Sequence, residues 1–83
     1  MNIQVTPNTL FRMAKDGHAA ECVMANSPVG VEAQLLIDGR MLASYQFGTD
    51  AEAVVWAIEK GTDLTTRGWK VQGRRTQQQY LAA

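Results

Sequence analysis

The chain has 83 residues, of which 46% are hydrophobic and 19% charged, and its formal net charge is zero. This composition is typical of one small folded domain and excludes a disordered chain. A zero net charge provides no electrostatic drive toward duplex nucleic acid or an anionic membrane. A core of this size supplies only ~3–5 kcal/mol of stability, so self-association is an attractive source of more.

Cys22 is the only cysteine, so an internal disulfide is excluded and the fold is not a cross-linked secreted scaffold. The first residues lack the basic and apolar regions of a signal peptide, and no apolar stretch approaches the ~18 residues that span a bilayer. We therefore expect a cytoplasmic protein without a membrane partner. Residues 1–83 are expected to form one domain with an ordered core over about 8–72, and the polar residues 73–83 a flexible tail.

The first hairpin is signalled by Asp16-Gly17, an Asp-Gly pair with apolar runs on both sides. A two-residue loop at this pair places Phe11 opposite Cys22 and Arg12 opposite Glu21. A shift of one residue would instead set Phe11 against Glu21 and bury a charge against an aromatic ring. The two-residue loop is therefore predicted.

The second hairpin is signalled by Asp38-Gly39. A two-residue loop would oppose Val31 to Gln46 and mix apolar with polar positions on each face. A three-residue loop over 37–39, ending in a left-handed glycine and a bulge, instead opposes Val31 to Tyr45. We therefore predict the bulged turn, and a further turn at residues 26–28 that joins the two hairpins.

A helix follows the hairpins, because Thr49 and Glu52 have the spacing of a capping box. At about 100° per residue, four apolar side chains fall on one side of this helix: Ala51, Val54, Val55 and Ile58. Gly61 is expected to end or kink the helix, Gly68 to stop it, and residues 69–71 to form a short strand or a packing strap. The predicted fold class is α+β, a four-stranded antiparallel meander with one α-helix packed across one face.

No residue pattern indicates catalysis or metal binding. His18 is the only histidine, has no cysteine pair or acidic cluster nearby, and is predicted to be an exposed turn residue. Cys22 lies four residues along the same strand, ~13 Å away, and points into the apolar face, so the two do not form a nucleophile and base. No glycine-rich phosphate loop is present. We expect no catalytic residue, no metal and no cofactor.

Three surfaces are candidates for partner binding. Trp56 lies within the polar sector of the helix, either as an interface anchor or buried at its margin. The back of the sheet, away from the helix, is predicted to present aliphatic side chains that a second subunit could cover: Leu10, Val23, Leu36 and Leu42. A basic cluster near the C-terminus supplies candidate phosphate contacts: Arg67, Lys70, Arg74 and Arg75.

From Leu10 to Trp69 the chain resembles a loose group of small uncharacterised bacterial proteins. The resemblance is carried by residues 30–32 and 37–40 in the second hairpin and by Arg67-Gly68-Trp69 after the helix. These motifs are structural and imply no activity. The order of four strands and a helix also resembles one repeat of the Whirly and Pur-type single-strand nucleic-acid binders, without their dense basic and aromatic sheet surface.

The predicted function is a non-enzymatic protein-interaction module that binds itself, as a homodimer, or another protein. Two alternatives stay open. One is a single-stranded nucleic-acid binder that uses the basic cluster, although nucleic acid is not favoured by the charge balance. The other is a phage-type inhibitor that binds a host protein, a class to which small proteins of this size often belong.

Overall fold

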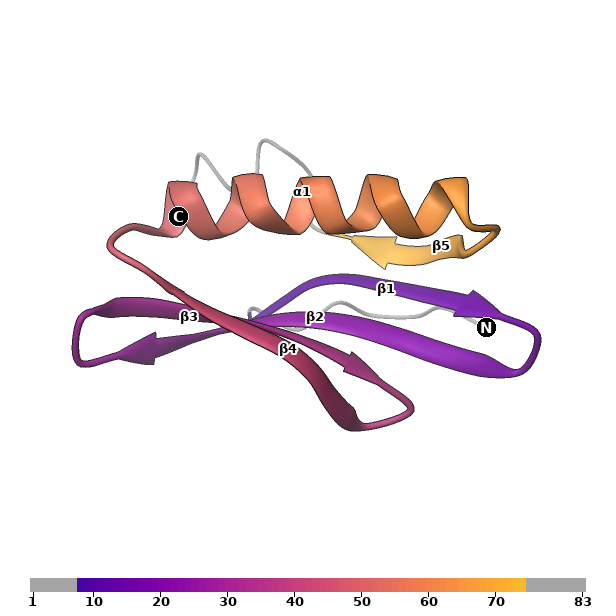
Figure 1. Cartoon of the computed structure of the whole chain (residues 1–83), viewed down its shortest axis with the longest axis horizontal. Helices are drawn as coiled ribbons and strands as arrows, with labels where there is room; N and C mark the ends of the chain where they lie inside the picture. Colours follow the sequence, from indigo (N-terminus) through magenta and orange to yellow (C-terminus); the bar gives the residue numbers. More distant parts are fainter. Residues whose placement is uncertain (1–7, 75–83) are drawn as a thin grey trace.

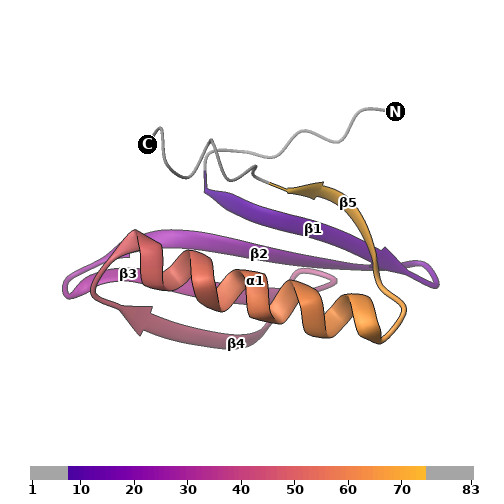
Figure 2. The ribbon, with the colours of Figure 1, turned by 90° about the horizontal axis from the view of Figure 1, so that it is seen from above.

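The computed structural model describes residues 8–74 and has an α+β fold, a five-stranded antiparallel sheet with one helix lying across it (Figure 1). The elements in chain order are β1 (Thr9–Lys15), β2 (His18–Ser27), β3 (Gly30–Ile37), β4 (Arg40–Phe47), α1 (Asp50–Thr66) and β5 (Lys70–Arg74). The strand order in the sheet is β4-β3-β2-β1-β5. The predicted meander and its covering helix are confirmed, and β5 is a fifth, short strand beside β1 (Figure 2).

The first hairpin has the predicted register. Asp16 and Gly17 both have left-handed backbones, with φ values of 50° and 81°, as a two-residue hairpin turn requires. Phe11 lies opposite Cys22, and Arg12 lies opposite Glu21 with 3.5 Å between the Arg12 Nε and Glu21 Oε2 atoms. The turn and the matched side chains on both faces favour the same pairing, so the prediction is confirmed.

Leu10 does not lie on the back of the sheet, where the sequence pattern placed it. Thr9 is opposite Val23 and Phe11 is opposite Cys22, so Leu10 is the extra residue of a β-bulge. An extra residue interrupts the alternation of faces, and Leu10 is fully buried in the core cluster that contains Phe11. The bulge therefore adds a leucine to the core and removes one from the opposite face.

The predicted three-residue loop of the second hairpin is wrong. Asp38-Gly39 forms a two-residue turn with φ values of 51° and 81°, nearly identical to the first. The pairing of β3 with β4 then shifts by one residue at Leu42, a β-bulge that leaves this residue without a counterpart in β3. As a result Val31 lies opposite Phe47, where the bulged-turn prediction opposed it to Tyr45.

Two further boundaries differ from the prediction. β2 extends through Ser27, so the turn to β3 is formed by residues 28–29 and not by 26–28. Of the two alternatives for residues 69–71, the structure shows the short strand, which covers Lys70–Arg74 as β5 and sets Val71 opposite Met13 of β1. Residues 73 and 74, predicted to be in a flexible tail, belong to this strand, and residues 75–83 lie outside the described part of the chain.

The helix begins at the predicted capping box. The backbone N–H of Glu52 donates to the Thr49 hydroxyl at 3.2 Å, and that hydroxyl donates to the Glu52 carboxylate at 3.1 Å. The helix does not end at Gly61 but continues through it to Thr66. Glycine weakens a helix interior without interrupting its hydrogen bonds, and the ring of Phe11 lies beneath this position.

Gly68 stops the helix just after its last turn, as predicted. Gly68 has a φ of 96°, its N–H donates to the Thr65 carbonyl at 3.1 Å, and the Trp69 N–H donates to the Leu64 carbonyl at 3.1 Å. These bonds form a Schellman motif, which satisfies carbonyls that the last helical turn leaves open. Trp69 and Leu64 both pack against the main core cluster, so the motif also directs the chain into β5.

The predicted apolar face of the helix is correct only in part, since Val54 is half-buried and packs against the main core cluster but Ala51 is exposed. Val55 is 57% exposed and Ile58 is 56% exposed, whereas Ala53 and Ala57 are buried against the sheet. Trp56 explains the rotation, because it packs on the side of the helix over β4 and buries more apolar area than a valine or isoleucine does. Small residues then face the sheet and let the helix approach it closely.

Candidate interaction surfaces

His18 is exposed, as predicted, but it has a partner. Its Nδ1 atom lies 2.6 Å from Oδ2 of Asp38, and the other oxygen of that carboxylate accepts a hydrogen bond from the Ala19 N–H at 2.9 Å. Asp38 belongs to the second turn, so the contact joins the two hairpin turns. Mainly the Ala19 bond, and then the His18 bond, lower the pKa of Asp38 below its ordinary value. This arrangement stabilises the turns, and the residues described contain no cluster of metal-ligand side chains.

Cys22 is fully buried in the main core cluster. Burial, with a smaller contribution from the charge of Glu21, raises the pKa of its thiol to about 12. The thiol is therefore protonated at neutral pH and has the properties of a small apolar side chain, as the sequence predicts.

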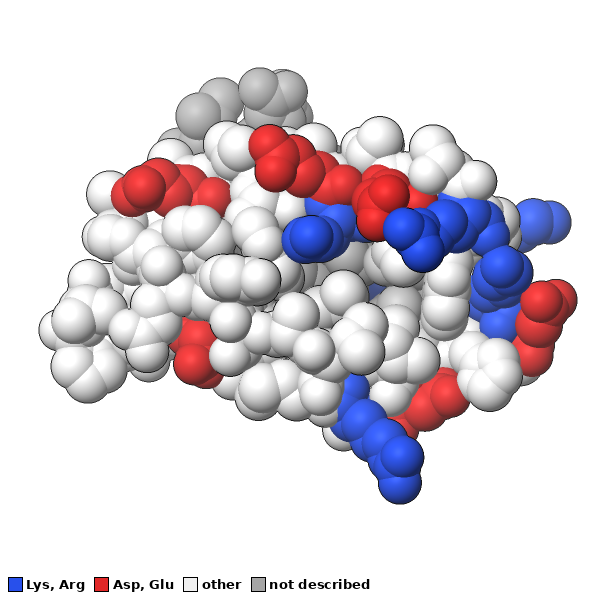
Figure 3. Space-filling view, in the orientation of Figure 1, with Lys and Arg blue, Asp and Glu red and all other residues white. Residues whose placement is uncertain are grey.

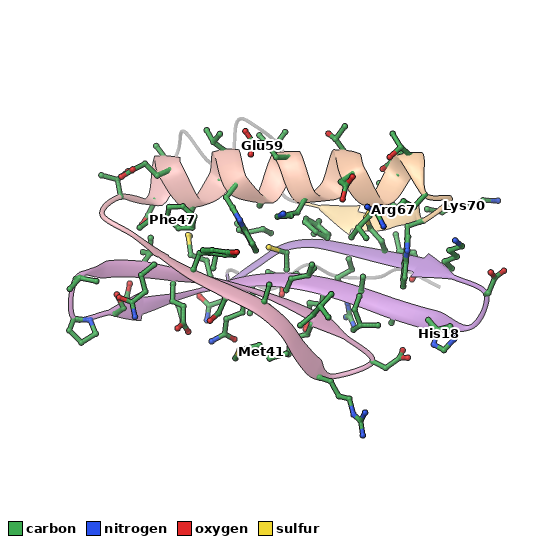
Figure 4. All side chains as sticks on the ribbon, in the orientation of Figure 1. His18, Met41, Phe47, Glu59, Arg67 and Lys70 are labelled. Atoms are coloured by element: carbon green, nitrogen blue, oxygen red, sulfur yellow. The ribbon has the colours of Figure 1, made fainter. Side chains whose placement is uncertain are left out.

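The basic cluster is assembled only in part within the described residues. Arg67 and Lys70 lie at the same end of the molecule (Figure 4), whereas Arg75 and the side chain of Arg74 lie outside the part described. Lys15, which the prediction did not include, donates from Nζ to the Arg67 carbonyl at 2.6 Å, and Arg67 Nε lies 3.6 Å from an Asp63 oxygen. A cation on the last carbonyls is favourable because the C-terminal end of a helix carries partial negative charge.

The back of the sheet is less apolar than predicted. Leu10 is absent from it, Val23 and Leu36 are half-buried, and Leu42 is 67% exposed at the bulge of β4. Each of two aliphatic residues has a polar residue as its partner on the neighbouring strand: Gln34 lies opposite Val23, and Glu21 lies opposite Leu36. Met41, which the prediction did not include, lies opposite Leu36 on this face, so an apolar patch remains there with polar residues beside it.

Trp56 is half-buried at the margin between the helix and the sheet. Its ring centroid lies 5.5 Å from that of Tyr45 and 6.2 Å from that of Phe47, and Lys60 Nζ lies 5.7 Å from it. We call Tyr45, Phe47 and Trp56 the aromatic cluster. Tyr45 is 55% exposed, because the helix covers the inner strands and leaves β4 at its margin (Figure 2). The aromatic cluster therefore exposes the ring of Tyr45 to solvent at the edge of the sheet.

The edge strand β4 is the least protected surface. It is eight residues long, pairs with β3 alone among the described elements, and has a single charged residue, Arg40, at its start. Met41 is 56% exposed and projects away from the helix, whereas Phe47 lies on the helix side (Figure 4). Figure 3 shows that the surface over β4 is mostly uncharged, while charged side chains concentrate along the helix. Long apolar edges of this kind are normally blunted by charges or proline unless another strand covers them.

Comparison with protein-family models, with curated proteins and with solved structures finds no match. None of the helices in the described residues combines the length and apolarity required to span a membrane.

Proposed function

We propose that this chain is a non-enzymatic protein-interaction module that forms a homodimer through antiparallel pairing of two β4 edges. The observation that carries the proposal is the edge of β4, which has a strand neighbour on one side only and no charge after Arg40, with the exposed ring of Tyr45 beside it. Pairing with a second copy would satisfy the outward backbone groups of the edge and cover apolar surface at the same time.

The hydrogen-bond alternation of the ladder identifies the backbone groups available for pairing. In β3, the two-residue turn at either end makes the odd-numbered residues bond to β4 and the even-numbered residues to β2. Tyr45 and Phe47, which lie opposite odd-numbered residues, therefore direct their N–H and C=O groups inward. Ser44 and Gln46 direct theirs outward, toward a second strand.

One register fits these groups. Centring the two-fold axis on Tyr45 pairs Ser44 of one protomer with Gln46 of its partner, and each such pair exchanges two backbone hydrogen bonds. The paired segment, residues 43–47, is the part of β4 that follows the bulge at Leu42 and pairs regularly with β3. Tyr45 then lies against Tyr45 of the other protomer, and the two aromatic clusters become continuous.

The β4 edge fits a second copy better than the back of the sheet does, because the predicted back surface has lost Leu10 to the core. The basic cluster is the alternative surface, for phosphate groups, but two cations at this end of the molecule already have partners within the chain. Arg67 is paired with Asp63, and Lys15 with the end of the helix. The described residues therefore favour protein over nucleic acid as the partner.

Sedimentation equilibrium of the wild type and of two lysine variants tests the proposal. Tyr45→Lys places two ammonium groups against each other across the axis and is expected to abolish the dimer. Met41→Lys, at a residue of almost equal exposure outside the paired segment, is the matched control and should preserve it. The proposal is wrong if the wild type stays monomeric at a concentration on the order of hundreds of micromolar, or if both variants weaken the dimer equally.

A cysteine cross-link tests the register itself. Directly opposed residues at a non-hydrogen-bonded position have Cα atoms about 4.5 Å apart, within disulfide range. Tyr45→Cys is therefore expected to form a disulfide-linked dimer under mild oxidation. Ser44→Cys should not, because the two copies of residue 44 are diagonal neighbours about 7–8 Å apart. Equal cross-linking of both variants would contradict the register.

A further inference from the structure

A pocket of about 220 Å³ lies at the opposite side of the molecule from the β4 edge, between α1, β1 and β5. We propose that this pocket binds a free, uncharged aromatic molecule of one or two fused rings. The proposal does not depend on the homodimer, because none of the residues that line the pocket belongs to β4.

The pocket has a buried floor and an accessible rim. Leu10, Met13 and Ala57 on the floor are at most 2% exposed. On the rim, Ile58 is 56% exposed and Val71 is 47% exposed. A ring that enters between the rim residues would cover their exposed apolar surface and lie above a closely packed apolar floor, which is the arrangement of a small-molecule site.

The predictions that failed account for this pocket. The bulge at Leu10 sends a leucine to the floor, and the rotation of the helix sends Ile58 to the rim instead of onto the sheet. Gly61 provides room at the centre, since a Cβ atom at that position would lie 3.7 Å from the ring of Phe11. A glycine at this point leaves space that any side chain would fill.

The lining selects against charge. Among the residues that the structure describes, those that line the pocket carry no charge. The Thr65 hydroxyl donates to the Gly61 carbonyl at 2.9 Å and the Thr66 hydroxyl donates to the Asp63 carbonyl at 2.6 Å, so both use their donors on the helix backbone. An anionic ligand would lose its hydration at the floor without a donor from either of these hydroxyl groups, which is costly.

The volume indicates the size of the ligand. An enclosed apolar cavity of about 150 Å³ accepts benzene. A half-open pocket of about 220 Å³ therefore admits a ring system one step larger, such as the fused pair of indole. The lining comes from the helix on one side and from β1 and β5 on the other, an arrangement that suits a flat ring.

Titration of the full chain with indole, followed by amide chemical shifts, tests the proposal. The largest shifts are expected at Ala57, Gly61 and Val71, which line the pocket. Indole-3-carboxylate, which adds a negative charge to the same ring, should bind at least about tenfold more weakly. Absence of indole binding up to its solubility, shifts centred elsewhere, or equal affinity for the two compounds would each overturn the proposal.

Two matched variants locate the site. Ile58→Glu places a carboxylate on the rim and is expected to lower the affinity for indole at least about tenfold. Val55→Glu, three residues earlier in the same helix and equally exposed, does not line the pocket and should leave the affinity within about twofold. Thr62→Lys, also on the rim, provides a second blocking change if the first variant is unstable. Equal losses in the rim variants and in Val55→Glu would contradict the location.

Discussion

Gly61 lies within α1, and replacing it with alanine is expected to stabilise the fold. The helix continues through this position without a break, so alanine meets no conformational barrier. A Cβ atom built there would lie 3.7 Å from two atoms of the Phe11 ring, which is ordinary van der Waals contact. The Gly61→Ala methyl group therefore fits without displacing its neighbours.

The magnitude follows from two contributions. Alanine exceeds glycine in helix propensity by about 0.8–1.0 kcal/mol within a helix. The half-buried methyl adds a fraction of the ~0.8 kcal/mol that a fully buried methylene contributes. We expect a total gain of about 1 kcal/mol, which for a domain of this size raises the Tm by about 4–8 °C.

Gly68→Ala is the matched control, because it makes the same chemical change at the end of the same helix with the opposite expected sign. Gly68 has a φ of 96°, a conformation that disfavours a Cβ by roughly 1–2 kcal/mol. Thermal and urea unfolding, followed by circular dichroism at a fixed protein concentration, measure both variants. A fixed concentration is needed because the proposed dimerisation would raise the apparent stability.

A loss of stability in Gly61→Ala would refute the reasoning. It would mean that the helix lies closer to Phe11 than the 3.7 Å contact indicates, so that a methyl group forces the helix away from the sheet. A gain in both variants would show that reduced chain entropy of the unfolded state, and not the local conformation, determines the effect.

Three other predictions concern the core and the titrating groups. Leu35→Ala, at a side chain only 5% exposed, should destabilise the fold by ~2–5 kcal/mol in urea unfolding, and a loss below this range would question the core assignment. Asp38 has a lowered pKa in the folded state, so its contribution to stability is present above its ordinary value of 3.8 and is lost as pH falls through the lower folded value. Asp38→Asn should remove this part of the acid dependence. If the variant and the wild type lose stability equally between pH 7 and about 3, the bonds of Asp38 to Ala19 and His18 contribute little. Cys22, with a pKa near 12, should react with a thiol reagent at pH 8 only as the chain unfolds, and stability should fall as pH rises above 9, where only the unfolded thiol ionises.

The sequence predicted correctly where one local signal and the side-chain pattern agreed. At the first hairpin, the Asp-Gly turn and the opposition of Phe11 to Cys22 required the same register. The capping box at Thr49 and the stop at Gly68 were equally readable, since each depends on a few adjacent residues. These elements establish the meander and the length of the helix.

The bulges were not readable in the same way. At Leu10 and at Leu42 the extra residue lies next to another apolar residue, Phe11 in one case and Met41 in the other. Alternation of apolar and polar side chains loses its phase where two apolar residues are adjacent, so the pattern does not show which of them has no partner. The second hairpin was therefore assigned a bulge at its turn, when the bulge lies two residues beyond it.

The helix face was misjudged because hydrophobic periodicity weighs side chains by type and not by the surface they can reach. Val55 and Ile58 made an apolar side of the helix in projection, but Trp56 contacts two rings of β4 only if that side turns away from the sheet. The strand β5 was equally hard to assign, because its five residues contribute one large apolar side chain, Val71, and the pairing with β1 is made by the backbone.

Both candidate surfaces arise at these points of departure. The shift at Leu42 sets Tyr45 opposite Ala33, whose small side chain leaves room for the ring to reach Trp56, and so creates the open end of the aromatic cluster at the β4 edge. On the other side, the rotated helix leaves Ile58 above the space between β1 and β5. Turns, helix caps and most core positions can be predicted from local sequence patterns. The exposed surfaces depend instead on the orientation in which the helix packs on a twisted sheet. A change that rotated the helix back, by removing Trp56, would therefore alter the β4 edge and the pocket together, although they lie at opposite sides of the fold.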